Sequence, residues 1–205
     1  MQEFLQGFYE KLLLTSPLEL IAVLSAVVYV VLAARQIIWC WAFAALASAI
    51  FVYLCIFSKL YIESILQLFY FVMAIYGWLL WKQKLKSKET FKIVRWTWKR
   101  HLFLGLISLT LMFVLALLFD FYTDTASPYL DAFTTSFSFA ATFMVAKKVL
   151  ENWLYWILID GFSVVLYSSR DLNLTAVLYI FYTFIAIFGF ISWYKSYQKQ
   201  QLDAA

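Results

Sequence analysis

The stretch ESILQLFYFVMAIYGWLLW at residues 63–81 indicates a repeated architecture, because a similar stretch, TAVLYIFYTFIAIFGFISW, follows at residues 175–193. The two stretches share a leucine, a Phe-Tyr pair, an Ala-Ile pair, a glycine and a tryptophan at matching places. The same offset of 112 residues pairs further residues upstream: Glu19 with Asp131, Arg35 with Lys147, Trp41 with Trp153, and Leu60 with Leu172. Chance similarity between apolar helices does not keep all these residues in one register. The sequence therefore predicts two copies of a three-helix unit.

Seven apolar segments are long enough to cross a bilayer, whose core of about 30 Å needs about 20 helical residues. They lie near 16–34, 37–57, 60–81, 101–119, 128–146, 151–168 and 172–194. We expect an all-α integral membrane protein arranged as 3+1+3, with repeats at 16–81 and 127–194. A single linker helix between two triplets restores the direction of the first, so the repeats are expected to be parallel.

The composition excludes a soluble globular enzyme. Hydrophobic residues make up 65% of the chain and charged residues only 14%, against about 25% charged in an ordinary soluble domain. The net charge of +4 is small, which disfavours a nucleic-acid partner. One histidine, His101, and two separated cysteines offer no cluster for a metal site. No cofactor is expected.

The remaining segments are an N-terminal stretch at 1–15, a basic linker at 82–100, a linker helix with its outer loop at 101–126, and a tail at 195–205. The N-terminal stretch is either an amphipathic helix on the membrane surface or an extension of the first span. Positive charge gathers on the cytoplasmic side of membrane proteins.

We therefore place the basic linker and the C-terminus inside the cell and the N-terminus outside. With this orientation, all but three of the 16 basic residues are cytoplasmic. The three on the outer side are Lys11, Lys59 and Arg170.

Asp160 stands about halfway through the sixth apolar segment, where a carboxylate is costly unless it faces a cavity or a partner. We interpret it as part of a substrate or ion site. The alternative is a structural carboxyl that is protonated or hydrogen-bonded. Gly161 follows directly and allows another backbone or a ligand to come close.

Asn152, Trp156 and Asp160 recur at intervals of four, which favours one helix face carrying an amide, an indole and a carboxylate. Trp153 lies beside that face. An aromatic cation suits this set, because an indole attracts a cation by about 2 kcal/mol when desolvated. The alternative is that both tryptophans belong to the interfacial aromatic belt.

Gln67 and Tyr70 in the third segment, and Tyr179 and Tyr182 in the seventh, are further candidates for the substrate site. An amide is costly in lipid and should face inward, whereas a tyrosine often only packs. Glu19 and Asp131 favour a structural role, since both lie in the first turn of their helices. Catalytic residues are not expected.

Parallel repeats are typical of transporters whose substrate site lies between two halves that rock against each other. An intramembrane enzyme would need a second catalytic group at the depth of Asp160, and the chain offers none. A structural or receptor-like protein is the other alternative, and it predicts no transport in liposomes.

Residues 63–81 and the segment ENWLYWILID at 151–160 resemble the PnuC family of bacterial vitamin transporters. The second segment is similar to the family pattern WxxWxxxN/D through Trp153, Trp156 and Asp160. The resemblance implies a fold related to the SWEET sugar transporters, a homotrimer, and facilitated diffusion in the bacterial inner membrane. It also implies a vitamin without phosphate that a cytoplasmic kinase later traps.

The resemblance leaves the vitamin open. Members that carry nicotinamide riboside tend to have Asn in place of Asp160, and an Asn in the second span where this chain has Ala47 and Ser48. These departures lead us to expect thiamine as the substrate. Nicotinamide riboside is the alternative, followed by riboflavin or another nucleoside.

Overall fold

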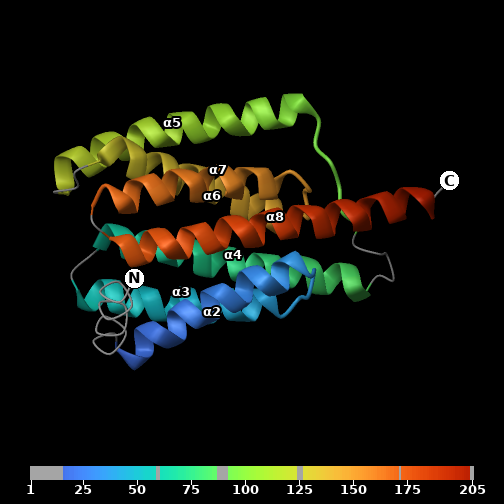
Figure 1. The fold of residues 1–205 in the computed structure, drawn as a ribbon, viewed down its shortest axis with the longest axis horizontal. Coiled ribbons are helices and arrows are strands. Elements are labelled where there is room, and N and C mark those ends of the chain that lie inside the picture. Colours follow the sequence, from blue (N-terminus) through green and yellow to red (C-terminus); the bar gives the residue numbers. More distant parts are fainter. Residues whose placement is uncertain (1–15, 59–60, 87–91, 124–126, 171, 204–205) are drawn as a thin grey trace.

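The computed structural model describes residues 16–58, 61–86, 92–123, 127–170 and 172–203, and within them the chain forms seven helices (Figure 1). Their bounds are Pro17–Ala34 (α2), Cys40–Phe57 (α3), Tyr61–Lys86 (α4), Trp98–Tyr122 (α5), Pro128–Ala146 (α6), Asn152–Ser168 (α7) and Asn173–Leu202 (α8). The expected all-α class is confirmed. The expected amphipathic helix at 1–15 lies outside the described residues.

Six of the helices form a closed ring, in which α2 contacts α3, then follow α4, α6, α7 and α8, and α8 returns to α2. We call this the six-helix ring. The seventh helix, α5, lies outside it and packs chiefly on α6. Consecutive helices run in opposite directions along a common long axis (Figure 1). The ring therefore has two ends, and the C-terminus marks one of them.

Five helices are long and apolar enough to cross a membrane, namely α2, α3, α4, α5 and α8. The expected spans at 128–146 and 151–168 correspond to helices α6 and α7, which fall short of that standard. Helix α7 has only 17 residues, and α6 carries a series of serines and threonines. A helix enclosed by other helices does not need a lipid-facing apolar surface, and nine residues of α6 are buried.

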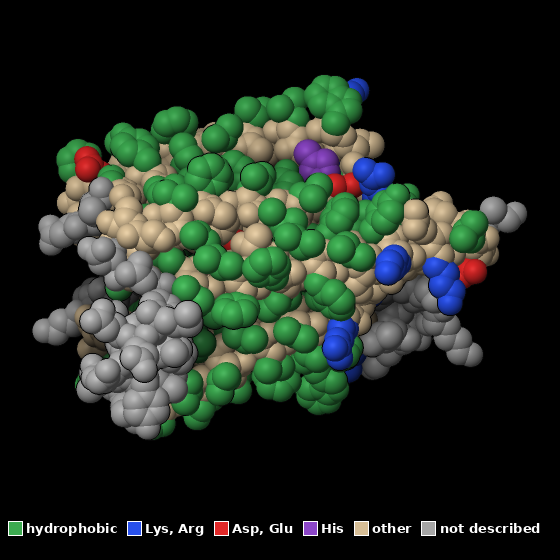
Figure 2. All heavy atoms as spheres, in the orientation of Figure 1, with side chains coloured by type: hydrophobic (Ala, Val, Ile, Leu, Met, Phe, Trp, Pro, Cys, Tyr) green, Lys and Arg blue, Asp and Glu red, His purple; other side chains and the backbone are tan. Residues whose placement is uncertain are grey.

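Apolar side chains spread over the face of the molecule that Figure 2 shows, while Lys and Arg gather on this face at the end where α8 runs toward the C-terminus. We call this end the basic end. Helix α5 is exposed along most of its length through large apolar side chains such as Phe103, Phe113 and Phe121. An apolar girdle with charge at its rim is the surface expected of a membrane protein.

Two helices run beyond their apolar segments. The apolar run of α4 ends near Trp81 and that of α8 near Tyr194, yet the helices continue to Lys86 and Leu202. Lys and Gln follow the apolar segments, and both are good helix formers in water. Hydropathy therefore marks where the bilayer ends rather than where the helix ends.

Two buried tryptophan pairs occupy matching places in the chain. The rings of Trp41 and Trp81 meet edge to face at 5.6 Å and 88°. The rings of Trp153 and Trp193, each 112 residues further on, meet at 5.5 Å and 87°. All four side chains are at most 2% exposed. The two pairs belong to the main hydrophobic core.

We call α2–α4 the first half of the ring and α6–α8 the second half. One indole of each pair donates a hydrogen bond to the other half. Nε1 of Trp81 in α4 donates to the carbonyl of Ala146 at the end of α6, over 3.0 Å. Nε1 of Trp193 in α8 donates to the carbonyl of Ala33 in α2, over 3.1 Å. Both acceptors lie in the last turn of a helix, where carbonyls lack a partner within the helix.

The segment before α5 binds the turn between α6 and α7. Val94 pairs with Val149 in a single parallel bridge. The amide of Val94 donates to the carbonyl of Lys148 over 3.0 Å, and the amide of Leu150 donates to the carbonyl of Val94 over 2.9 Å. The Arg95 guanidinium adds an ion pair with Glu151 at 2.9 Å. The end of the basic linker is thus fastened to the second half of the ring.

Candidate functional site

The six-helix ring encloses a cavity of about 580 Å³. All six ring helices contribute lining residues, and the lining among the described residues includes none from α5. A cavity of this size falls within the range of small-molecule sites, about 300–1,000 Å³. The candidate site is therefore the interior of the ring.

The structure brings seven of the eight predicted site residues to this cavity: Gln67, Tyr70, Trp153, Trp156, Asp160, Tyr179 and Tyr182. Asn152 is the exception. It is fully buried at the start of α7, and its Nδ2 donates to the carbonyl of Val149 over 2.6 Å. Its side chain therefore closes the turn before α7 and does not line the cavity.

Asp160 is 3% exposed and stands in the middle of α7. The lining formed by the described residues includes no Lys, Arg, His or Glu beside Asp160. Its carboxyl forms no hydrogen bond or ion pair with another described residue. An isolated carboxylate at this depth is costly unless a cation or hydrogen-bond donors join it.

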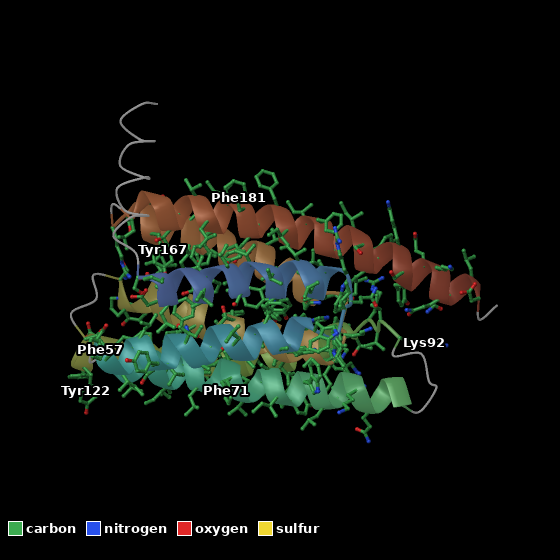
Figure 3. The ribbon with its side chains drawn as sticks, turned by 90° about the horizontal axis from the view of Figure 1, so that it is seen from below. Phe57, Phe71, Lys92, Tyr122, Tyr167 and Phe181 are labelled. Carbon is green, nitrogen blue, oxygen red and sulfur yellow. The ribbon has the colours of Figure 1, made fainter. Side chains whose placement is uncertain are left out.

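Tyrosines form much of the aromatic wall. The rings of Tyr167 and Tyr179 are stacked at 5.1 Å and 13°, and Tyr182 meets Tyr179 edge to face at 5.8 Å. Tyr167 lies toward the interior, whereas Phe181 projects from the outside of α8 (Figure 3). Phe181 is 61% exposed. Helix α8 thus carries aromatic side chains on the face that lines the cavity and on its outer face.

Sequence reasoning missed Tyr29, Trp41 and Tyr167, which also line the cavity. The sequence contained a feature that could have identified two of these residues. Trp41 is the repeat partner of Trp153. Tyr167 lies seven residues after Asp160, which returns it to nearly the same face of α7. Tyr29 carried no such signal, because its repeat partner is an alanine.

The walls of the cavity follow the repeat, but its polarity does not. On α3, Ser48 stands where α7 has Asp160, and both line the cavity. Ala44 stands where α7 has Trp156. The carboxyl of Asp160 and the indole of Trp156 therefore have no counterpart of the same kind at the matching positions of α3. A ligand in this cavity therefore meets a carboxyl and an indole on α7, and a serine and an alanine at the matching positions of α3.

A ring of membrane helices around a cavity with one buried charge defines a polytopic membrane protein with an internal small-molecule site, an architecture used by transporters. A family profile described as "Nicotinamide mononucleotide transporter" matches residues 16–195, and the chain belongs to this family of transporters. The resemblance to PnuC proteins read from the sequence is thereby confirmed.

Individual relatives agree. The chain is 28% identical over 170 residues to the nicotinamide riboside transporter PnuC of Escherichia coli strain K12, covering 69% of this chain and 70% of that protein. The PnuC protein of Shigella flexneri matches to the same extent. A crystal structure described as the vitamin B3 transporter PnuC superimposes with a TM-score of 0.73 at 20% identity, covering 95% of this chain and 88% of the other. At that identity the structural likeness supports the fold.

Proposed function

We propose that this protein carries nicotinamide riboside across the bacterial inner membrane. The single observation that carries this proposal is the buried carboxyl of Asp160 in the cavity lining, which forms no ion pair with another described residue. Nicotinamide riboside contains a pyridinium ring with one positive charge. Pairing that charge with Asp160 offsets the cost of burying the carboxylate, while Trp156 and the tyrosines supply faces for the aromatic ring.

The cavity disfavours the phosphorylated form of the same vitamin. Nicotinamide mononucleotide adds a phosphate to the riboside, and a phosphate needs Arg, Lys or a helix N-terminus around it. Among the described lining residues there is no basic side chain, and Asp160 would repel the added charge. The profile description names the mononucleotide, but the lining supports the riboside.

Thiamine, which the sequence led us to expect, is the weaker candidate. That expectation rested on Asp160 in place of the family's Asn and on Ala47 and Ser48 where the second span has an Asn. Thiamine and nicotinamide riboside both carry an aromatic cation. Asp160 can pair with either and does not distinguish them. The curated relatives are described as nicotinamide riboside transporters, which favours the riboside.

We infer that the two triplets α2–α4 and α6–α8 are parallel repeats that alternate access to the cavity, with α5 as the linker of a SWEET-like fold. The matching tryptophan pairs 112 residues apart support the repeat. Two indole bonds cross between the halves, and they must break if the basic end opens. We expect facilitated diffusion, since one carboxyl without a relay of others offers no path for a driving ion.

Orientation and assembly belong to the same proposal. The distribution of Lys and Arg supports a cytoplasmic position for the basic end, and we expect the N-terminus on the outer side. The homotrimer and the cytoplasmic kinase that traps the vitamin remain predictions from the family resemblance. The spanning helices and the family both support a place in the inner membrane.

Titration of the purified protein by tryptophan fluorescence tests the substrate. We expect nicotinamide riboside to bind more tightly than thiamine and nicotinamide mononucleotide to bind weakest. Asp160→Asn should weaken riboside binding about tenfold or more, as expected for loss of a desolvated charge pair. Asp120→Asn is the matched control, because Asp120 is exposed near the end of α5. Equal riboside affinity in wild type and Asp160→Asn would remove the support for this site.

A further inference from the structure

Helices α6 and α2 occupy equivalent places in the two halves, but they present different chemistry to the cavity. Four hydroxyl side chains of α6 line it. One of them, Thr134, donates to the carbonyl of Asp131 over 3.0 Å. We call the other three the hydroxyl row: Thr135, Ser138 and Thr142. The residues 112 positions earlier on α2 also line it, and we call them the aliphatic row: Val23, Ala26 and Val30. At each of these positions, α6 therefore presents a hydroxyl to the cavity and α2 presents a hydrocarbon side chain.

The hydroxyl row follows one face of α6. Its members are spaced i, i+3 and i+7, which keeps them on one side of a helix. Ser138 is 7% exposed and Thr142 is 5% exposed. The hydroxyl of Thr142 donates to the Ser138 carbonyl over 2.8 Å, so its oxygen remains an acceptor toward the cavity.

A second observation points to a ligand beside this row. Asp160 is 97% buried, lines the same cavity, and forms no ion pair with a described residue. The cavity therefore offers a carboxyl on α7 and hydroxyls on the adjacent α6. A molecule that joins a cationic ring to several hydroxyl groups satisfies both at once.

We propose that the hydroxyl row is the subsite for the sugar of a cationic riboside. The inference rests on the proposed function and deepens it, because it assigns the two parts of the ligand to different helices. Asp160 and Trp156 take the charged ring, the hydroxyl row exchanges hydrogen bonds with the sugar, and the aliphatic row packs against the opposite face. Selection of a riboside over a cation without a sugar then comes from α6.

The repeat itself supplies the test, since α2 shows which side chains fit at these positions. The triple variant Thr135→Val, Ser138→Ala and Thr142→Val gives α6 the aliphatic row of α2. The probes are nicotinamide riboside and 1-methylnicotinamide, which has the same cationic ring without the sugar. The readout is the ratio of their affinities, measured by direct titration for the riboside and by competition for 1-methylnicotinamide.

We expect the wild type to prefer the riboside and the triple variant to lose at least about tenfold of that preference, as expected for several lost hydrogen bonds. Ser136→Ala is the control on the same helix. Its hydroxyl donates to the Ala132 carbonyl over 2.6 Å, and the residue is not part of the lining. The control should keep the wild-type ratio.

If the triple variant does not fold, Ser138→Ala and Thr135→Val measured singly should each lower the ratio about threefold. An unchanged ratio in a folded variant overturns the hydroxyl row as the sugar subsite, even where riboside binding persists. Equal affinity of the wild type for both probes overturns it as well. A wild type that binds neither probe contradicts the proposed function itself, and the subsite with it.

Discussion

Gln36 and Lys148 hold the same position in the two halves of the chain, 112 residues apart, and they bind each other: Nζ of Lys148 donates to Oε1 of Gln36 over 3.2 Å. Both backbones are left-handed, with φ of 60° and 53°. Left-handed backbone is uncommon for residues other than glycine, so both turns adopt the same costly conformation. Nζ of Lys148 also lies 4.7 Å from the centre of the Trp81 ring.

This contact predicts a pH dependence of stability. Lys148 lies in the turn between α6 and α7, and burial lowers the pKa of its ammonium to about 8, against about 10.4 for a free lysine. Below pH 8 the folded protein holds a buried charge. Between about pH 8 and 10.4 the unfolded chain binds more protons than the folded one, so stability rises with pH.

Lys148→Met removes this titration. Between pH 7.5 and 9.5 we expect the free energy of unfolding of the wild type to rise by on the order of 1–3 kcal/mol relative to that of the methionine variant. Thermal unfolding of the two purified proteins in detergent across this range measures the difference. Parallel curves for the two proteins would show that Lys148 does not titrate on folding.

Two glycines maintain close contact with the paired tryptophans. A Cβ at Gly77 would lie 2.4 Å from the Trp41 ring, and one at Gly189 would lie 2.7 Å from the Trp153 ring. Neither ring can move aside, because each is held edge to face by a second buried tryptophan. We therefore expect Gly77→Ala and Gly189→Ala each to destabilise the protein by about 1–3 kcal/mol.

Gly105 provides the control for this prediction. It lies in α5, where a Cβ meets no atom within 4 Å. Alanine is a better helix former than glycine by about 1 kcal/mol, so Gly105→Ala should be neutral or stabilising. Thermal unfolding of the three variants gives the comparison, and a tolerated alanine at both 77 and 189 would contradict the packing described for the core.

The indole bonds between the halves give a third prediction. Trp81→Phe leaves the Ala146 carbonyl without its donor, and Trp193→Phe does the same to Ala33. Loss of a buried hydrogen bond costs about 1–3 kcal/mol when the partner stays unsatisfied. Trp39→Phe should cost much less, because Trp39 is 59% exposed. Equal unfolding temperatures for all three variants would show that the indole bonds do not hold the halves together.

Much of the fold could be predicted from the sequence, because a lipid-facing helix needs a continuous apolar surface. The apolar segments predicted near 128–146 and 151–168 match α6 and α7 closely. Their weakness as membrane spans follows from the same physics. Helix α6 is largely buried within the protein, α7 has only 17 residues, and both carry polar side chains that line the cavity and lower their hydropathy.

The site could be predicted less fully, and helix geometry explains the error at Asn152. Residues four apart drift by about 40° around a helix, so Asn152 lies about 80° from Asp160. Seven residues drift by only about 20°, which keeps Tyr167 on the lining face. A spacing of seven from Asp160 was therefore the better guide. The identity of the vitamin did not follow from the charge, because both candidate vitamins share it.

The hydroxyl row needed the structure. Thr135, Ser138 and Thr142 look in the sequence like small residues of an ordinary packing face. The contrast with Val23 and Ala26 becomes meaningful only once both rows are known to line one cavity. The positions at which the two matching sequences differ, rather than those at which they agree, therefore led us to propose the hydroxyl row as a subsite.

Uptake of nicotinamide riboside into proteoliposomes that contain a phosphorylating enzyme tests whether the cavity carries this vitamin. We expect uptake that survives collapse of the proton gradient, resists competition by nicotinamide mononucleotide, and falls about tenfold or more in Asp160→Asn. Uptake of the mononucleotide at the same rate, or of thiamine in preference to the riboside, would contradict the claim that this cavity takes an unphosphorylated cationic riboside.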